Sequence, residues 1–199
     1  MTERLLELVE VVAGYDRPLT APCSLSLDRG EVLGLYGDNG AGKSTLLNSI
    51  VGSARVLAGQ VIRGPERGQA LGLRHLPQRP VRPAEAPLSG HDLLRCMAAQ
   101  ALTPPPRLAD RLDRRIDALS GGEYQLLCLW TCLAGDADLV LLDEPTNNLD
   151  PAHVDLAAEE ILAERQRRGT LLVSHDPAFL ERVCTRVVAI RPRNVAAAV

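Results

Sequence analysis

The chain has 199 residues, of which 46% are apolar and 24% charged, and its formal net charge is −3. This length and composition permit a buried core without metal or disulfide staples, so they exclude a disordered or collagen-like protein. No apolar run approaches the roughly 18 residues of a membrane helix, and the first residues lack the pattern of a secretory signal. We therefore expect a soluble cytoplasmic protein whose five cysteines are free, buried thiols.

The basic residues are unusual in kind rather than in number. All but one of the 22 Lys and Arg residues are arginines, and the exception is Lys43. Lysine ends in a compact ammonium, whereas arginine ends in a wide planar fork, so Lys43 is expected where a point charge must enter a narrow space. The slight acidic excess argues against non-specific binding to DNA or RNA, and no direct nucleic-acid partner is expected.

The first part of the chain predicts a β-rich start that leads into a strand, loop and helix. Strands are expected at residues 9–15, 23–27 and 31–36, and a helix is expected at 44–51. A strand-prone stretch at 56–76 is interrupted by glycines and predicts hairpin pieces.

The pattern changes at residue 79, where prolines begin to separate short helical segments. Helices expected at 91–102 and 108–119 predict an inserted helical subdomain at about 79–119. Beyond Ser120, helices and strands alternate, with helices expected at 123–133 and 151–168 and strands at 139–142 and 170–173. Such alternation implies a mostly parallel sheet that is covered on both faces.

A phosphate-binding motif follows the third expected strand. The segment G-D-N-G-A-G-K-S matches G-x-x-x-x-G-K-[ST] and opens a helix, which is the context that the motif requires. Its backbone N–H groups and the helix N-terminus favour phosphate oxygens, Lys43 would reach the β- and γ-phosphates, and Ser44 would offer its hydroxyl to Mg²⁺. An ordinary glycine turn is the alternative. The predicted nucleotide-binding residues are Gly37, Asp38, Asn39, Gly40, Ala41, Gly42, Lys43, Ser44 and Thr45.

Two acidic residues end the apolar strand expected at 139–142. A buried strand that ends in Asp143 places this carboxylate beside the phosphate loop, where it can hold Mg²⁺. Glu144 then faces an attacking water as a general base. Two acids at this point could instead begin a helix, but their combination with the phosphate loop favours the catalytic interpretation.

Together these segments resemble the ATP-binding subunits of the ABC ATPase family. Leu119–Glu123 matches the signature motif of that family, and Asp143–Asp150 looks like its second nucleotide motif followed by the D-loop. His175 falls on the switch histidine, Gln78 on the Q-loop glutamine, and Tyr15 on the aromatic residue that stacks against adenine.

The resemblance extends over about residues 5–190 and implies both a fold and an assembly. The fold is an α/β P-loop NTPase with a RecA-like core, an N-terminal antiparallel β-subdomain and a short helical insert, all in one domain over 1–199. The assembly is a head-to-tail dimer with ATP and Mg²⁺, in which Ser120, Gly121 and Gly122 contact nucleotide bound by the other copy. His175 would bond the γ-phosphate and the attacking water, and Gln78 would contact Mg²⁺.

Each of these roles has a plainer structural alternative. Ser120 would also serve as the N-cap of the following helix, and His175 as a polar residue that ends a strand. Tyr15 could be a strand aromatic and Gln78 a surface amide. The order of the motifs favours the functional roles. One departure from the family pattern is that no basic residue follows Gln125 in the signature helix.

We expect the chain to be the ATP-hydrolysing subunit of an ABC transporter, bound at the inner face of the cell membrane to integral membrane subunits. Coupling would pass through the Q-loop and residues 79–119. The alternative is a soluble ABC-type ATPase that acts on ribosomes or nucleic acid, because 146–150 and 174–180 look like the translation-factor branch. Residues 75–79 resemble metal-ion import subunits only weakly, so no transported substrate is predicted.

Overall fold

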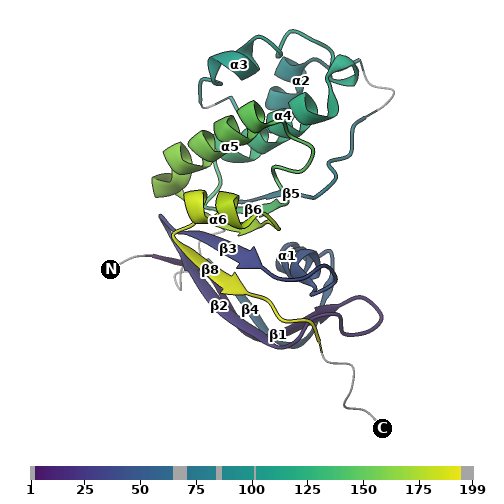
Figure 1. Ribbon diagram of the computed structural model, residues 1–199, viewed down its shortest axis with the longest axis vertical. Helices are drawn as coiled ribbons and strands as arrows, with labels where there is room; N and C mark the ends of the chain where they lie inside the picture. The colour runs from purple at the N-terminus through teal and green to yellow at the C-terminus, as the bar shows by residue number, and fades with distance from the viewer. Residues whose placement is uncertain (1–2, 65–70, 84–86, 101, 194–199) are drawn as a thin grey trace.

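The structure is a computed structural model that describes residues 3–64, 71–83, 87–100 and 102–193. In these residues the strands form two sheets (Figure 1). The antiparallel sheet has the order β2-β1-β4 and is built from β1 (Arg4–Gly14), β2 (Cys23–Asp28) and β4 (Arg55–Arg63). The other sheet is parallel with the order β5-β6-β7-β3-β8; it contains β3 (Val32–Tyr36), β5 (Leu73–Leu76), β6 (Leu139–Asp143), β7 (Gly169–Val173) and β8 (Arg186–Ala189).

The helices lie on both sides of the parallel sheet. They are α1 (Lys43–Val51), α2 (Gly90–Cys96), α3 (Pro106–Ala109), α4 (Gly121–Ala134), α5 (Pro151–Glu164) and α6 (Pro177–Val183). Short 3₁₀ turns add Ile116–Ala118 and Arg165–Arg167. Helices α4 and α5 pack side by side over one face, whereas α1 and the antiparallel sheet lie on the other (Figure 1).

The strands of the parallel sheet send alternate side chains into two apolar layers. On one face, Val140, Leu142 and Leu172 pack with α4, α5 and α6. On the other face, Leu141 and Val173 pack with α1 and the antiparallel sheet. Because both faces are covered, these strands are continuous apolar runs with no polar side, as the sequence pattern predicted.

Side-chain caps mark the start of four helices, among them α2, where Ser89 and Asp92 form a capping box. Ser120 Oγ accepts a hydrogen bond from the Glu123 N–H, and the Glu123 carboxylate accepts one from the Ser120 N–H, which closes a capping box on α4. Asp150 and Asp176 cap α5 and α6 by accepting backbone N–H bonds, without a reciprocal partner, and each is followed by a proline at the first helical position. These caps satisfy backbone donors that would otherwise lack partners.

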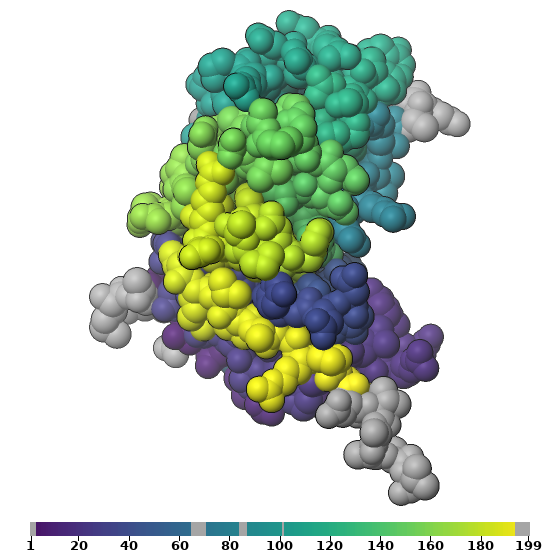
Figure 2. Space-filling view, viewed as in Figure 1, coloured from purple at the N-terminus to yellow at the C-terminus, as the bar shows by residue number. Residues whose placement is uncertain are grey.

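The helical insert is packed onto the rest of the chain. Apolar residues of α2, of α3 and of the 3₁₀ turn, including Leu94, Leu108 and Ile116, share one core cluster with α4 and the parallel sheet. Figure 2 shows this region in teal at the opposite end of the molecule from the first strands, which are purple. No helix in the described part of the chain is both long and apolar enough to cross a membrane.

The prediction of hairpin pieces within 56–76 is wrong. Strand β4 pairs antiparallel with β1, and β5 pairs parallel with β6, so the two strands belong to different sheets. Apolar alternation identifies strands but not their partners, because the partner is set by packing between distant segments. The first strand also begins earlier than predicted, at Arg4, because Leu5 and Leu6 are buried.

The helices of the insert are shorter than predicted, and two elements near the C-terminus were not predicted. Helix α2 ends at Cys96, α3 is a single turn, and residue 101 of the expected 91–102 helix lies outside the described residues. The missed elements are α6 and β8. All five cysteines are free, but only Cys128 and Cys132 are buried as expected; Cys23 and Cys184 are half-buried and Cys96 is exposed.

A close contact beneath α6 leads to a stability prediction. A Cβ on Gly34 of β3 would lie 2.8 Å from Cys184 Sγ and 3.0 Å from Leu180 Cδ2. Gly34→Ala should therefore lower the free energy of unfolding by about 1–3 kcal/mol, as overpacking of a core does. Removing the sulfur with Cys184→Ala in the same chain should recover part of the loss. Urea denaturation of both single variants and the double variant measures this coupling, and additive effects would contradict it.

Candidate nucleotide-binding site

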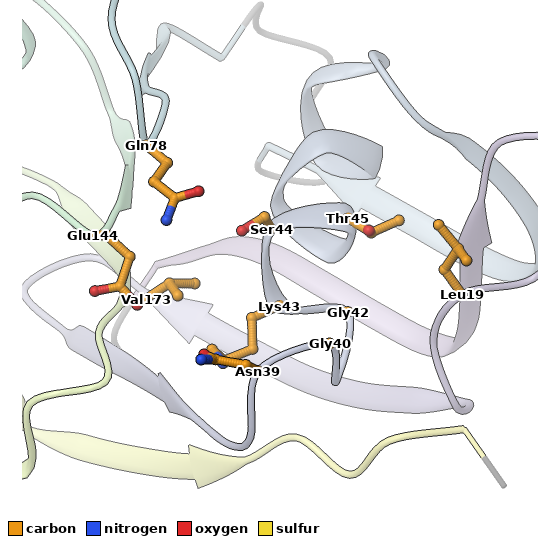
Figure 3. A pocket seen from close by; sticks show the side chains of 10 residues that line it. All are labelled: Leu19, Asn39, Gly40, Gly42, Lys43, Ser44, Thr45, Gln78, Glu144 and Val173. Carbon is orange, nitrogen blue, oxygen red and sulfur yellow. The ribbon is translucent and has the colours of Figure 1, made fainter.

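Four strand ends meet at one edge of the parallel sheet. The phosphate loop follows β3, His175 lies just beyond β7, Glu144 follows β6, and Gln78 lies just beyond β5. Neighbouring parallel strands point the same way, so their carboxyl ends must share an edge. Between them is a cleft of about 380 Å³, lined by the phosphate loop, Gln78 and Glu144 (Figure 3). This volume is in the range of small-molecule sites.

Glycines give the phosphate loop its close turn. Gly42 has φ +90 and caps α1, and a Cβ there would lie 2.7 Å from Thr20 Cγ2. A Cβ on Gly37 would collide with the carbonyl oxygen of Ile190. Backbone therefore packs on one side of the loop, while its other side opens to the cleft at the N-terminus of α1, where the helix dipole favours an anion.

Lys43 is buried within this loop, with 7% of its surface exposed. Its ammonium donates hydrogen bonds to the carbonyl oxygens of Gly37 at 2.6 Å and Asp38 at 3.0 Å. These partners offset the cost of burying the charge and hold the ammonium at the centre of the loop. This is the narrow setting that the sequence predicted for the single lysine of the chain.

Ser44 and Asp143 bring two oxygen ligands together across the cleft floor. Ser44 Oγ donates to Asp143 Oδ1 at 3.1 Å. Burial raises the pKa of Asp143, while the Ser44 hydrogen bond and the Lys43 charge oppose that shift. This hard oxygen set suits Mg²⁺, which takes few protein ligands beside phosphate oxygens and water. No group of three or more His, Cys, Asp or Glu in the described residues could bind a metal by itself.

Glu144 and His175 form a pair at the neighbouring strand ends. His175 Nδ1 lies 2.7 Å from Glu144 Oε2, so Nδ1–H donates to the carboxylate and Nε2 is left to face a ligand. Glu144 is buried and has φ +51, whereas the His175 side chain is 65% exposed. A left-handed backbone at a residue with a side chain is strained, and such strain clusters at functional sites. The strain here aims the carboxylate along the cleft wall.

Gln78 and Tyr15 are placed differently with respect to the cleft. Gln78 lines it, on the same side as Glu144 and facing Ser44 in Figure 3. Tyr15 is 45% exposed and is not among the residues that line the cleft, and its hydroxyl accepts a hydrogen bond from Asn48 Nδ2 at 3.2 Å. The side chain that lines the cleft near Tyr15 is instead Leu19.

Sequence reasoning missed two lining residues, Leu19 and Val173. Leu19 reaches the cleft because a tight loop directs the N–H groups of Leu19 and Thr20 to the same carbonyl oxygen, that of Ala13. Val173 is the last residue of β7. Neither carries a chemical group that a motif could identify, so their role follows only from the folded backbone.

Ser120, Gly121 and Gly122 do not lie at this cleft. They open α4, which covers the face of the parallel sheet opposite to α1 (Figure 1). Ser120 and Gly121 are exposed, and a Cβ on Gly122 would lie 3.3 Å from the Asn148 carbonyl oxygen in the D-loop segment. One chain thus gathers the phosphate loop, both acids, His175 and Gln78 but leaves the signature segment apart.

Comparisons with known proteins agree with this geometry. The model of the ABC transporter family matches residues 20–147. The chain is 33% identical to the zinc import ATP-binding protein ZnuC of Marinobacter nauticus, over 96% of this chain and 76% of that protein. It superposes with a TM-score of 0.80 on the ATP-binding subunit of an ABC transporter, at 28% identity, covering 94% of this chain and 86% of that one.

A further solved structure is the complex of an archaeal ribosomal stalk protein with the ribosome recycling factor aABCE1. The match has a TM-score of 0.77 at 27% identity and covers 94% of this chain but 37% of that one. These alignments span both sheets and the helical insert, and they confirm the α/β P-loop fold that the sequence predicted. The chain belongs to the ABC transporter family and is an ATP-binding ATPase of that family.

Proposed function

We propose that the chain is the ATP-hydrolysing subunit of an ABC transporter, and that two copies close head to tail around two molecules of MgATP. One observation carries the proposal. The cleft is lined by the phosphate loop and Glu144, with Asp143 bonded to Ser44 and His175 to Glu144, while a second glycine-rich helix start, at Ser120, is exposed elsewhere on the same chain. A head-to-tail pair would bring the second segment of one copy to the cleft of the other.

In this proposal the chain binds the triphosphate of ATP before any chemistry occurs. Lys43 and the N–H groups of the loop would hold the phosphates, and Tyr15 would stack against adenine. Ser44 and Asp143 would hold Mg²⁺, with Gln78 as a further contact, and the metal would neutralise charge on the phosphates. Leu19 would exclude water near the adenine ring.

Hydrolysis would then depend on the pair of Glu144 and His175. The Glu144 carboxylate would accept a proton from the attacking water. His175 donates to that carboxylate through Nδ1, which holds it in place, and its exposed Nε2 would contact the γ-phosphate. Ser120 and the first N–H groups of α4 would contact the same phosphate from the second copy, because a helix N-terminus favours an anion.

Glu144→Gln should separate binding from chemistry. The amide retains the shape of the side chain but cannot accept the proton, and general-base catalysis contributes roughly 10²–10⁴ in rate. The variant should bind ATP, hydrolyse it slowly and accumulate as a dimer with two trapped nucleotides. Size-exclusion chromatography with MgATP, together with nucleotide analysis of the dimer peak, measures this outcome.

Asp143→Asn is the matched control for Glu144→Gln, because it makes the same chemical change one residue earlier at the predicted metal ligand. It should lose the Mg²⁺-dependent gain in ATP affinity and stay monomeric. A Glu144→Gln chain that remains monomeric at saturating MgATP, or that turns over at the parent rate, would refute Glu144 as the base.

Ser120→Arg tests whether the signature segment serves the other copy. A bulky cation at the start of α4 should leave ATP binding by the monomer within about twofold, since Ser120 lies outside the cleft of its own chain, but should block dimerisation and turnover. Calorimetry with ATP and a steady-state turnover assay measure the two effects. Equal loss of binding and turnover would instead place Ser120 in the site of its own chain.

A second candidate function is a soluble ABC-type ATPase that acts on ribosomes. The match to the ribosome recycling factor complex favours it, although this chain covers 37% of that protein chain. The similarity to ZnuC and to a transporter subunit, each covered over three quarters or more of its length, favours transport. In the transport proposal the chain would lie at the inner face of the membrane, and residues 79–119 would couple it to the membrane subunits.

Affinity purification of the tagged Glu144→Gln chain from its native cells distinguishes the two functions. For a transporter, detergent extracts should yield integral membrane subunits in a fixed ratio to the chain. A ribosomal protein would instead sediment with ribosomal particles in a sucrose gradient. Recovery with ribosomes and without membrane subunits would overturn the transport proposal, and the wild-type chain purified in parallel controls for nucleotide dependence.

A further inference from the structure

Two side chains connect the segment that follows Gln78 to the first turn of α4. The Arg82 guanidinium donates to the carbonyl oxygens of Leu119 at 2.9 Å and Ser120 at 3.1 Å. It also lies over the Tyr124 ring, with Cζ 4.5 Å from the ring centroid. Tyr124 closes the connection, because its hydroxyl donates to the carbonyl oxygen of Val81 at 2.8 Å. We call this set of contacts the Arg82–Tyr124 clamp.

The contacts of the clamp fix the orientation of the Arg82 guanidinium and of the Tyr124 ring. A planar guanidinium that spans two successive carbonyl oxygens cannot rotate without breaking a bond, and its stacking on an aromatic face adds a cation–π contact. Tyr124 is buried, with 6% of its surface exposed, so its ring is itself fixed by the core of α4. Arg82 and the Leu119–Ser120 backbone are therefore held in a fixed position relative to each other.

The chain between Gln78 and the clamp is short and stiff. Arg82 follows Gln78 by four residues, and prolines stand at positions 77, 80 and 83. Proline fixes φ, and it also restricts the residue before it, so this segment has little freedom to absorb a displacement at one end. A shift of Gln78 at the cleft would therefore be expected to displace Arg82.

Arginine side chains gather around the start of α4. Glu123, the capping carboxylate, is paired with Arg111 at 2.6 Å and Arg114 at 3.3 Å, and Arg82 adds a third guanidinium nearby. Cations at a helix N-terminus oppose the helix dipole, so Arg82 does not stabilise α4 through the dipole. Its contacts with the Leu119 and Ser120 carbonyl oxygens instead fix the position of this backbone.

We propose that Arg82 and Tyr124 are positioning residues that couple the two nucleotide sites of the dimer. Through the clamp, Gln78 at the cleft of one chain fixes the orientation of Ser120, which meets the nucleotide held by the second copy. Occupancy of one site thereby prepares the other. The inference rests on the proposed head-to-tail dimer and adds to it the residues within one chain that connect the sites.

The test uses Glu144→Gln as the parent chain and measures the MgATP concentration that gives half-maximal dimer. Adding Arg82→Ala should raise this concentration about tenfold, the size expected from loss of a charge-assisted hydrogen bond, and should bring the Hill coefficient for ATP toward one. ATP affinity of the monomer, measured without Mg²⁺, should stay within about twofold, because Arg82 lies outside the cleft.

Arg79→Ala is the matched control, since it removes the same charge from the same segment at an exposed residue outside the clamp. Tyr124→Phe keeps the ring but loses the bond to Val81, so its effect should be smaller than that of Arg82→Ala. It also preserves the test if Arg82→Ala fails to fold. Arg82→Lys should rescue only in part, because a lysine keeps the charge but loses the planar guanidinium that stacks on the Tyr124 ring.

The possible outcomes distinguish failure of the clamp inference from failure of the proposed dimer. If the Glu144→Gln parent dimerises and the folded Arg82→Ala and Tyr124→Phe variants match Arg79→Ala in MgATP dependence and Hill coefficient, the clamp inference is wrong and the dimer remains. If the parent itself does not dimerise, the proposed function fails and the inference with it. A selective shift with Arg82→Ala and a smaller one with Tyr124→Phe support both.

Discussion

The parallel pairing of β5, β6, β7 and β3 is the constraint on which this site depends. Strands β6 and β7 are buried along their whole length and are mostly apolar, so the charged residues of the site stand where these strands end. Parallel direction then brings these ends to one edge. Gln78, the Asp143–Glu144 pair and His175 come from segments far apart in the chain, and they lie at one edge because their strands are neighbours in the sheet.

Charge balance at this edge follows from the same burial. Lys43 and Asp143 are both nearly inaccessible to water, and each is stabilised by specific partners: backbone carbonyl oxygens for the ammonium, the Ser44 hydroxyl for the carboxylate. Low exposure strengthens every interaction with an incoming phosphate, since less water screens it. Glu144 has a strained, left-handed backbone, and the surrounding sheet holds it there, where the reacting groups would meet.

The signature segment is subject to a different constraint. It begins α4, whose apolar side must cover the sheet face opposite to α1, so its N-terminus emerges away from the phosphate loop of the same chain. Three sets of contacts hold this N-terminus in place: the Ser120–Glu123 capping box, the packing of Gly122 against the D-loop, and the Arg82–Tyr124 clamp. The chain therefore presents an exposed helix start whose backbone is held by side-chain contacts.

The sequence by itself determined the chemistry and the local elements. The phosphate loop, the acids after an apolar strand and the signature glycines are short-range patterns, and the placements of Lys43, Ser44, Asp143 and Glu144 at one cleft agree with them. Tertiary structure alone decided the pairing of β4 and β5 with different sheets, the lining roles of Leu19 and Val173, and the bond from His175 to Glu144. The physical reason is that strand partners and apolar linings are chosen by long-range packing, which leaves no mark in a local pattern, whereas phosphate and metal chemistry demands particular residues at a particular spacing.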